Sequence, residues 1–450
     1  MRNARVFLAV LLAPVFSQAA ELRANDYGAK GDGTTLNTAA IQKALDAASA
    51  NGDTVVLSPG IYLTGALFLR SGAHLHLDAG VELHAIQEQS AYPIMPTRVA
   101  GVEMNWPAAL INIYEQSNVK ITGQGVIDGD GKFWWDKYWR LRQEYDGKGL
   151  RWAADYDSQR VRLLQVFKSD HVELQGLNLR RSGFWTVHIC YSKNVTVDGI
   201  TIRNNIGGRG PSTDGIGVDS SSDVLIQNAD IENNDDAIVM KAGRDSDGLR
   251  VNRPTENVIV RDITVRDGAA GITFGSETSG SIRHVEAYRI HVLAPTPIGV
   301  LFKSASTRGG TVEDVSIHDI DMQGGRIAFS VAFNWNPSYS YAKIPQDMTG
   351  PDYWTVLAAE VPHDKGIPHL RNVRISNFKA TGVQEAFSVA SYADSPLQNV
   401  TFQNLEIQAL RAGQIANADN WKFENTHIQT ADGSQLALKE SRGITGLPSK

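Results

Sequence analysis

Three aspartates lie in two segments of the chain whose residues match one another. Residues 214–218 (DGIGV) align with residues 236–240 (DAIVM), and Asp235 directly precedes the second segment. If these segments are neighbouring strands in register, their carboxyl groups lie about one strand spacing apart, about 4.8 Å. Like charges that close repel, so at least one acid should have a raised pKa and keep its proton. A proton donor beside ionised carboxylates is what cleavage of a glycosidic bond requires, although an aspartate ladder satisfied by turn amides would look the same in sequence.

The two matching segments belong to a repeat that runs through most of the chain. Each unit starts with a polar residue or turn former and then alternates apolar and other residues, as at 118–121 (NVKI), 171–174 (HVEL), 194–197 (NVTV), 223–226 (DVLI) and 257–260 (NVIV). The units recur mostly 23 to 34 residues apart, which indicates a solenoid. Alternation with period two and three short strands per unit predict an all-β fold, a parallel β-helix of about ten coils and roughly 50 Å in length. The alternatives are a β-sandwich or a propeller, whose blades would repeat near 40 residues with four strands.

Other segments complete this solenoid. Residues 35–50 have helical apolar spacing and should form a helix that caps the open N-terminal end of the stack. Insertions near 130–160 and 333–370 interrupt the repeat and are rich in tryptophan and tyrosine. Long loops on a solenoid usually form its binding face. These aromatic residues either bind the apolar faces of sugars or fasten the loops to the coils.

The coils on either side of the acids carry further candidate residues. Alignment of the preceding coil places Trp185 and His188 on one side of the acids, and alignment of a later coil places Lys303 on the other. These three residues are candidates for substrate binding. The single cysteine, Cys190, alternates inward and is expected in the core.

The N-terminus and the composition limit where the protein works and what it binds. Residues 1–19 have a positive start, a short apolar stretch and small residues at the end, which predicts a cleavable signal peptide and a secreted or periplasmic protein. Residues 20–450 are expected to form a single catalytic β-helix domain. A net charge of -6 without a basic face argues against nucleic acid, and no later run is apolar enough to span a membrane. One cysteine excludes a disulfide framework and a cysteine zinc site. We also expect no metal, no cofactor and a monomer.

At these residues the chain resembles the polygalacturonase family, glycoside hydrolase family 28. Residues 26–33 (DYGAKGDG) are similar to the entry of many pectin-active β-helix proteins, residues 212–214 (STD) correspond to the family's Asn-Thr-Asp motif, and Asp235-Asp236 to its Asp-Asp pair. The resemblance implies a right-handed parallel β-helix and inverting hydrolysis of α-galacturonosidic bonds in a pectic polysaccharide or oligosaccharide. It implies that Asp235 is the general acid, and that Asp214 and Asp236 hold and deprotonate the attacking water.

The chain departs from the family pattern in two places. Ala270 stands where the family has a histidine, and Leu301 stands where it has an arginine, so that of the family's Arg-Ile-Lys only Lys303 remains. An apolar Leu301 would accept the methyl group of rhamnose, which predicts a backbone of alternating galacturonate and rhamnose. The alternative is that the loop at 243–254, which resembles an insertion of exo-acting members, restores uronate binding through its arginines. These are Arg244, Arg250 and Arg253.

Two other functions fit a β-helix. A pectin lyase on the same scaffold would cleave by β-elimination, commonly with calcium, and would release unsaturated products. A non-catalytic rod would bind polysaccharide without turnover. The three aligned acids favour hydrolysis over both.

Overall fold

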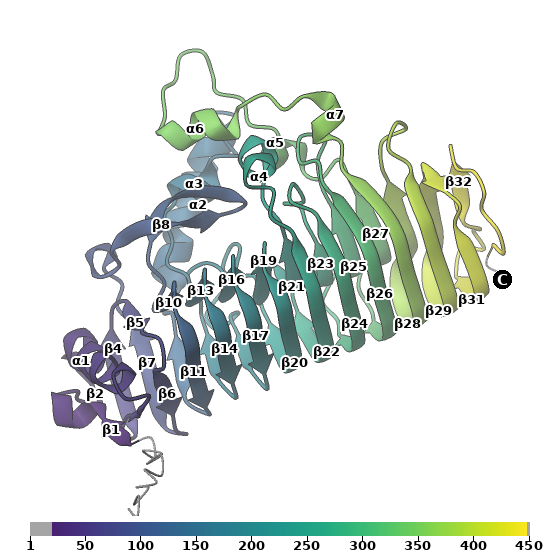
Figure 1. Cartoon of the computed structure of the whole chain (residues 1–450). Helices are drawn as coiled ribbons and strands as arrows, with labels where there is room; N and C mark the ends of the chain where they lie inside the picture. The colour runs from purple at the N-terminus through teal and green to yellow at the C-terminus, as the bar shows by residue number, and fades with distance from the viewer. Residues whose placement is uncertain (1–19, 448–450) are drawn as a thin grey trace, which may run out of the picture.

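The computed structural model describes residues 20–447, which wind into a long stack of coils (Figure 1). All its strands except β8 and β9 form one 30-stranded parallel sheet that closes on itself as a β-helix, as the repeat predicts. Connections between parallel strands of this kind are right-handed. The predicted signal peptide at residues 1–19 lies outside the described residues. Within residues 20–447, no helix is long and apolar enough to cross a membrane.

Three ladders of parallel strands make up the walls of the coils. The first ladder consists of β1 (Glu21–Arg23), β3 (Thr54–Val56), β6 (His74–Leu77), β11 (Ser117–Gly123), β14 (Asp170–Gln175), β17 (Lys193–Asp198), β20 (Ser222–Glu232), β22 (Thr255–Asp267), β24 (Ile282–Val292), β26 (Thr311–Gln323), β28 (His369–Ala390), β29 (Leu397–Ala416) and β31 (Lys422–Thr430). The second consists of β2 (Asp32–Leu36), β4 (Gly60–Thr64), β7 (Val81–Ala85), β12 (Val126–Asp128), β15 (Asn178–Arg180) and β18 (Thr201–Arg203), and continues in the second parts of the long strands from β20 onward.

The third ladder carries the acids. It consists of β5 (Leu67–Leu69), β10 (Ile111–Tyr114), β13 (Leu164–Phe167), β16 (Val187–Cys190), β19 (Ile216–Asp219), β21 (Asp236–Lys241), β23 (Ala270–Phe274), β25 (Ile298–Lys303) and β27 (Ile327–Ala332), and continues into β28, β29 and β32 (Ala437–Lys439). The short strand β30 (Ala418–Asp419) pairs with β29 near the C-terminal end.

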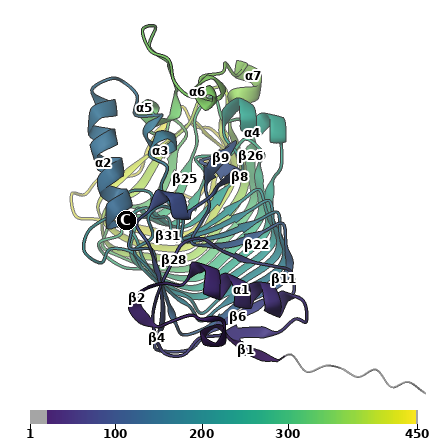
Figure 2. The ribbon, with the colours of Figure 1, turned by 90° about the vertical axis from the view of Figure 1, so that its left-hand side faces the viewer.

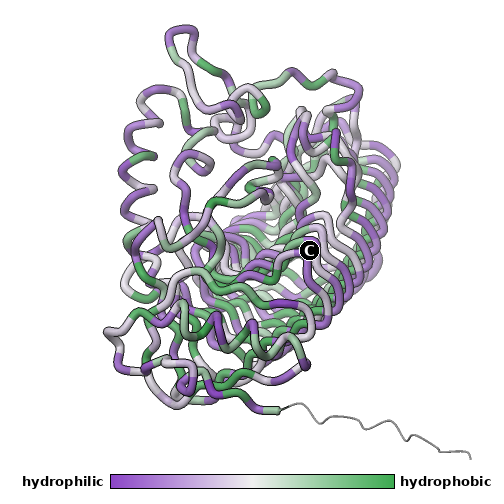
Figure 3. Tube along the Cα trace, turned by 60° about the vertical axis from the view of Figure 1, so that its left-hand side comes forward, coloured by the Kyte–Doolittle hydropathy of each residue, from purple (hydrophilic) through white to green (hydrophobic). Residues whose placement is uncertain are grey.

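Apolar residues stack on their equivalents in the interior of the coils. Val195 and Val197 pair with Val224 and Ile226 in the next coil, and all four side chains are buried. In Figure 3 hydrophobic segments follow the stacked strands, while hydrophilic residues gather at the outer corners of the coils. A single coil cannot bury its apolar side alone, so the core exists only because neighbouring coils stack.

The polar residue that opens each repeat makes the corner of its coil. Asn194, Asp223 and Asn257 have φ angles of 53°, 56° and 56°, in the left-handed region that asparagine and aspartate tolerate. Their side chains also connect the coils, because Asn257 Nδ2 donates to Asp223 Oδ1 at 3.1 Å. Asn194 and Asn399, which match glycosylation sequons, are such corner residues.

The predicted cap is helix α1 (Thr38–Ser49), which buries Ile41, Ala44 and Leu45 against the first coils. Further excursions leave the coils above the N-terminal half of the third ladder, on the same side in Figures 1 and 2. They are the antiparallel hairpin β8 (Ile94–Val99) and β9 (Val102–Pro107) after η2 (Gln89–Ala91), the helices α2 (Lys132–Asp146) and α3 (Ala154–Asp157), α4 (Asp245–Val251), and α5 (Pro337–Ser340), α6 (Asp352–Leu357) and α7 (His363–Gly366). A short η1 (Ala24–Tyr27) precedes β2. The hairpin was not expected from the sequence.

Candidate active site

The three aspartates meet where β19 and β21 begin. Ile216 pairs with Ile238 across these strands, and the Gly215 amide donates to the Asp236 carbonyl at 2.9 Å, so Asp214 lies in register with Asp236. Asp214 and Asp236 are buried, Asp235 is half-buried, and all three line one pocket. The aligned register of the acids in the sequence is therefore the register of the structure.

Asn233 fixes the turn that presents Asp235 and Asp236. Its Nδ2 donates to the carbonyls of Thr213, Asp235 and Asp236 at 3.1, 2.9 and 2.9 Å. The Asp236 amide in turn donates to Asp235 Oδ1 at 3.0 Å. One buried amide thus holds both acid-bearing turns at once, which limits the freedom of the carboxyl groups.

Two lysines flank the acids. Lys303 Nζ lies 2.7 Å from Asp236 Oδ2, and Thr273 Oγ1 donates to Asp236 Oδ1 at 2.8 Å. Lys241 Nζ lies 3.6 Å from Asp214 Oδ2. Among the described residues Asp235 forms no ion pair, so of the three acids it is the one that faces the pocket without a cation of its own.

The surroundings of the acids shift their proton affinities. Burial, with the charge of Asp235, raises the pKa of Asp214 well above its usual range, although Lys241 opposes the shift. Burial, with the charge of Asp236, likewise raises the pKa of Asp235. Such close carboxyl groups titrate as a unit. The trio therefore retains a proton at pH values at which an ordinary aspartate has lost it.

Asp214→Asn is expected to stabilise the fold, and more strongly at neutral than at acidic pH. The pKa of Asp214 is raised above the value of about 3.9 that it has in an unfolded chain, so the folded protein binds the proton more tightly. That contribution is complete below the unfolded pKa and is lost as the pH rises towards the folded pKa. Each unit of the shift costs about 1.4 kcal/mol of stability at higher pH, and the neutral amide avoids this cost.

Thermal unfolding of the variant and the wild type between about pH 4 and about pH 7 checks this. The difference in Tm should widen as the pH rises. Asp223→Asn, which removes a carboxylate from an exposed coil corner, is the matched control. A Tm difference for Asp214→Asn that does not depend on pH would show that its carboxyl group is not destabilised in the folded protein.

Three excursions enclose the pocket around the acids. Ala100 at the tip of the β8–β9 hairpin forms part of the wall, together with Arg151 and Asp155 from the first insertion and Tyr339 from the second. The remaining lining residues are Phe184, Trp185, Ser212, Lys241, Ser276, Glu277, Lys303, Trp335 and Asn336, with the three acids. Both predicted insertions therefore reach the site.

Most of the aromatic residues in the two insertions attach the insertions to each other or to the coils. Asp157 accepts hydrogen bonds from Tyr145, Tyr353 and Trp354, which ties the first insertion to the second. Trp134, Trp135, Tyr138 and Trp152 are buried. Phe133 and Trp139 are exposed, whereas Trp335 and Tyr339 line the pocket, so the two alternatives for these loops apply to different residues.

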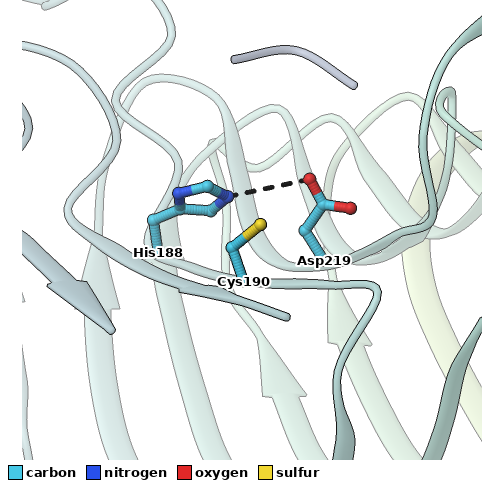
Figure 4. Close-up of side chains that lie close together, drawn as sticks. All are labelled: His188, Cys190 and Asp219. Carbon is cyan, nitrogen blue, oxygen red and sulfur yellow. Dashed lines mark ion pairs between the residues drawn. The ribbon is translucent and has the colours of Figure 1, made fainter. Parts of the chain in front are cut away.

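Of the residues predicted to bind substrate, Trp185 and Lys303 line the pocket, whereas His188 does not. His188 is buried behind Trp185, where its Nε2 lies 3.7 Å from Asp219 Oδ2 (Figure 4). Burial lowers the pKa of His188 to about 4, so its ring is neutral. His188 lies in the strand ladder in which the repeat predicts it, but the segment that covers it there is not part of the repeat.

The β8–β9 hairpin covers His188 and encloses a group of buried polar residues. Cys190 belongs to this group and lies beside His188 and Asp219 (Figure 4), outside the apolar interior of the coils in which it was expected. Arg98 Nη1 lies 3.0 Å from Asp219 Oδ1, and Arg162 Nη1 lies 2.9 Å from His188 Nδ1. The two guanidinium groups thus supply the positive charge next to these residues.

The three loop arginines do not face the pocket. Arg244 is fully buried and binds Asp245, Arg250 pairs with Asp247 and Glu103, and Arg253 donates to the Tyr191 carbonyl. These residues hold the loop with α4 against the hairpin and the coils. The structure places none of these predicted substrate-binding residues at the pocket, since Arg244 and Arg250 pair with acidic side chains and Arg253 donates to a backbone carbonyl.

Leu301 is not available to a sugar either. It is buried in a small apolar cluster with Ala270, Ile298 and Ile327, and Trp335 packs over this cluster. Ala270 and Leu301, which stand where the family has histidine and arginine, therefore form part of an apolar surface under Trp335. The centre of the Trp335 ring also lies 4.8 Å from Lys303 Nζ. The expected contact between Leu301 and a rhamnose methyl group was wrong for this reason.

Arg151, Asp155, Lys241 and Glu277 line the pocket but were not predicted from the sequence. One of them had a usable signal: Lys241 ends the strand that starts with Asp236 and alternates to the same outer face as Val239. The others come from insertions or from the turn after β23, where the repeat gives no register.

A sequence model of glycosyl hydrolases family 28 matches residues 64–337, which include all three acids and both lysines. The chain belongs to this family. The predicted family and the prediction of a glycoside hydrolase are therefore confirmed. A second model, "Rhamnogalacturonase A/epimerase, pectate lyase-like", matches residues 22–88, the N-terminal entry of the β-helix.

Relatives in this family come from plants and bacteria. The chain is 29% identical to a "Probable polygalacturonase" of Vitis vinifera, over 90% of this chain and 78% of that protein. It is 27% identical to an "Exo-poly-alpha-D-galacturonosidase" of Dickeya chrysanthemi, over 91% and 74%. The solved structure of a Yersinia enterocolitica family 28 exopolygalacturonase superposes with a TM-score of 0.79 at 22% identity, over 96% of this chain and 79% of that one. This superposition confirms the β-helix fold.

Proposed function

We propose that this family 28 enzyme hydrolyses α-galacturonosidic bonds at the end of a pectic chain. The observation that carries the proposal is the pocket itself, in which three aspartates lie between two lysines and beside an arginine. Carboxylates supply the acid and the bases of glycoside hydrolysis, and the cations suit a sugar that carries a carboxylate. The relatives named for polygalacturonase activity support the same substrate.

In the proposed mechanism Asp235 is the general acid. It faces the pocket without a cation, and its raised pKa lets it carry a proton to the glycosidic oxygen as the bond from C1 breaks. Lys303 and Thr273 hold Asp236, so its carboxylate serves as a base. Asp236 and Asp214 position a water whose oxygen attacks C1 and whose proton passes to them. Attack opposite the leaving group inverts the anomeric centre, as the family resemblance implies.

The enclosure of the pocket supports action at chain ends. The hairpin tip, the first insertion and the second insertion all contribute to the walls around the acids, which favours a site that admits a chain end over a groove through which a polymer runs. The similarity to the "Exo-poly-alpha-D-galacturonosidase" of Dickeya chrysanthemi, which extends over 91% of this chain, supports the same mode of action. We therefore propose an exo-acting enzyme that admits the last sugar of a chain.

Arg151 is the proposed contact for the carboxylate of that sugar. Its Nη1 donates to Asp155 Oδ2 at 2.8 Å, and its guanidinium lies 5.1 Å from the ring centre of Tyr339. Its Nε is buried and has no hydrogen-bond partner within residues 20–447. A buried donor without a partner is costly, and a carboxylate in the pocket would satisfy it.

Arg151→Ala should therefore weaken binding of galacturonate oligomers. A charge-assisted hydrogen bond is worth about 1.5–3 kcal/mol, which corresponds to a rise in KM of roughly 10- to 100-fold. Arg142→Ala, which removes a half-buried arginine of α2 that pairs with Asp146, is the control and should leave KM unchanged. If Arg151→Ala lowers kcat and leaves KM at the wild-type value, Arg151 does not hold the ground-state sugar.

Initial rates on matched oligomers test the proposed function. Because Leu301 is covered, we expect kcat/KM to be higher on galacturonate oligomers than on oligomers that alternate galacturonate and rhamnose. Products without ultraviolet absorbance would exclude β-elimination. Unsaturated products would establish the lyase alternative, and binding without turnover would establish the non-catalytic rod. A preference for the rhamnose-containing oligomers would overturn the proposed specificity.

We further propose that residues 20–450 act as a single, monomeric catalytic domain outside the cytoplasm. The export pattern of residues 1–19 supports this location. Edman sequencing of protein recovered from the periplasm or the medium should start near residue 20, and retention of Met1 would contradict it.

A further inference from the structure

Lys241 brings a second ammonium group to the acids, in addition to that of Lys303. It ends β21, the strand that starts with Asp236, and its Nζ reaches back to 3.6 Å from Asp214 Oδ2. Strand pairing places Met240 beside Phe274 and Phe274 beside Phe302, so Lys241 and Lys303 occupy equivalent positions two coils apart. Each lysine contacts a different one of the two carboxylates to which we assign the role of base.

A chain of buried groups holds Lys241 in this position. Its Nζ lies 3.0 Å from Glu277 Oε2, and Glu277 Oε1 accepts a hydrogen bond from the Tyr339 hydroxyl at 3.1 Å. The ring of Trp185 lies 5.6 Å from the same ammonium group. Burial works against ionised Glu277, but Lys241 and Arg308 hold its pKa well below its usual range. Tyr339 comes from the second insertion, so this series of contacts connects the wall that the second insertion contributes to the pocket with Asp214.

We propose that Lys241 is a positioning residue that holds Asp214 as the second base, and that Glu277 and Tyr339 fix Lys241 for this task. This inference rests on the proposed function of the three acids. Direct binding of a sugar carboxylate fits Lys241 less well, because Glu277 already neutralises its charge and the side chain is buried. The charged and titratable groups that face Asp214 and Lys241 are Asp235, Asp236, Lys303, Glu277 and Tyr339.

Lys241→Met should lower kcat and move the acidic limb of the pH–rate profile. Misplacement of one base by about 1 Å costs roughly 100-fold, so a loss of kcat of about 10- to 100-fold is expected. Removal of a nearby cation raises the pKa of Asp214, and a base must be ionised, so the acidic limb should shift up by about one pH unit or more. Lys241→Arg keeps the charge and should keep the wild-type limb, and Tyr339→Phe should cause a smaller loss in kcat.

Lys193→Met, at an exposed lysine that pairs with Asp170, is the control and should match the wild type. Two outcomes would overturn the inference. A rise in KM with an unmoved acidic limb would make Lys241 a substrate ligand, and a lower Tm with unchanged kcat would make it a purely structural residue.

A second measurement needs no substrate and so separates this inference from the proposed function. Thermal unfolding at several pH values is compared for the wild type, Lys241→Met, Asp214→Asn and the double variant. If Lys241 acts on Asp214, the loss of Tm caused by Lys241→Met at neutral pH should shrink in the Asp214→Asn background. Equal losses in both backgrounds would show no coupling between the two residues, whatever sugar the enzyme cleaves.

Discussion

Asp235→Asn is expected to abolish turnover while the β-helix stays folded. The amide keeps the shape of the side chain and can still accept the Asp236 N–H, but it cannot donate a proton to the leaving oxygen with comparable driving force. Loss of a general acid costs at least about 100-fold in kcat. Because no ion pair of Asp235 is broken, the fold should lose little stability. Initial rates on galacturonate oligomers, with circular dichroism and Tm as checks on folding, measure both effects.

A second substrate distinguishes the loss of the general acid from the loss of a base. A substrate with an activated leaving group needs little protonation, so the Asp235→Asn variant should recover much of its rate on it, whereas a base variant should not. Asp223→Asn is the matched control, since it removes a carboxylate from an exposed corner of the same region. If Asp235→Asn retains near wild-type kcat and correct folding, Asp235 is not the acid.

Asp214→Asn and Asp236→Asn should each reduce kcat severely, and their effects should not multiply. Both carboxylates are expected to hold one water, so removal of either leaves that water without its correct orientation. Each single change is expected to cost roughly 100- to 10,000-fold, and the double variant should be little worse than the poorer single variant. Rate measurements on the two single variants and the double variant give the coupling directly.

The two base variants should differ in stability. Asp236→Asn leaves Lys303 without its partner at 2.7 Å and should lower Tm, whereas Asp214→Asn is expected to raise it at neutral pH. Losses of kcat that multiply in the double variant would mean that the two residues act in separate steps, which would contradict a shared water.

The sequence predicted the parts of the site that lie on the coils. Asparagine and aspartate recur at the corners, as at 194, 223 and 257, because only a few residue types tolerate the left-handed backbone there. This recurrence sets the alignment of the repeats. That alignment was sufficient to place Asp214 over Asp236, because a parallel ladder keeps one register from coil to coil. Trp185 and Lys303 followed from the same register.

The parts of the site that come from excursions could not be predicted in this way. Arg151 meets Tyr339 across almost two hundred residues of chain, and no local pattern encodes that contact. His188 alternates to the face of the ladder that carries the site, yet it is buried beside Asp219, which Arg98 of the β8–β9 hairpin covers. The loop arginines looked free for a substrate because their partners, such as Glu103 on that hairpin, belong to segments without repeat register.

The products released from galacturonate oligomers labelled at the reducing end test the central claim most directly. An enclosed pocket that admits only the end of a chain should release unlabelled short sugars from the far end, and the labelled product should shorten in regular steps from the first time point. The first released sugar should carry the inverted anomeric configuration. Random internal cleavage at early times, with labelled products of all lengths, would contradict the account.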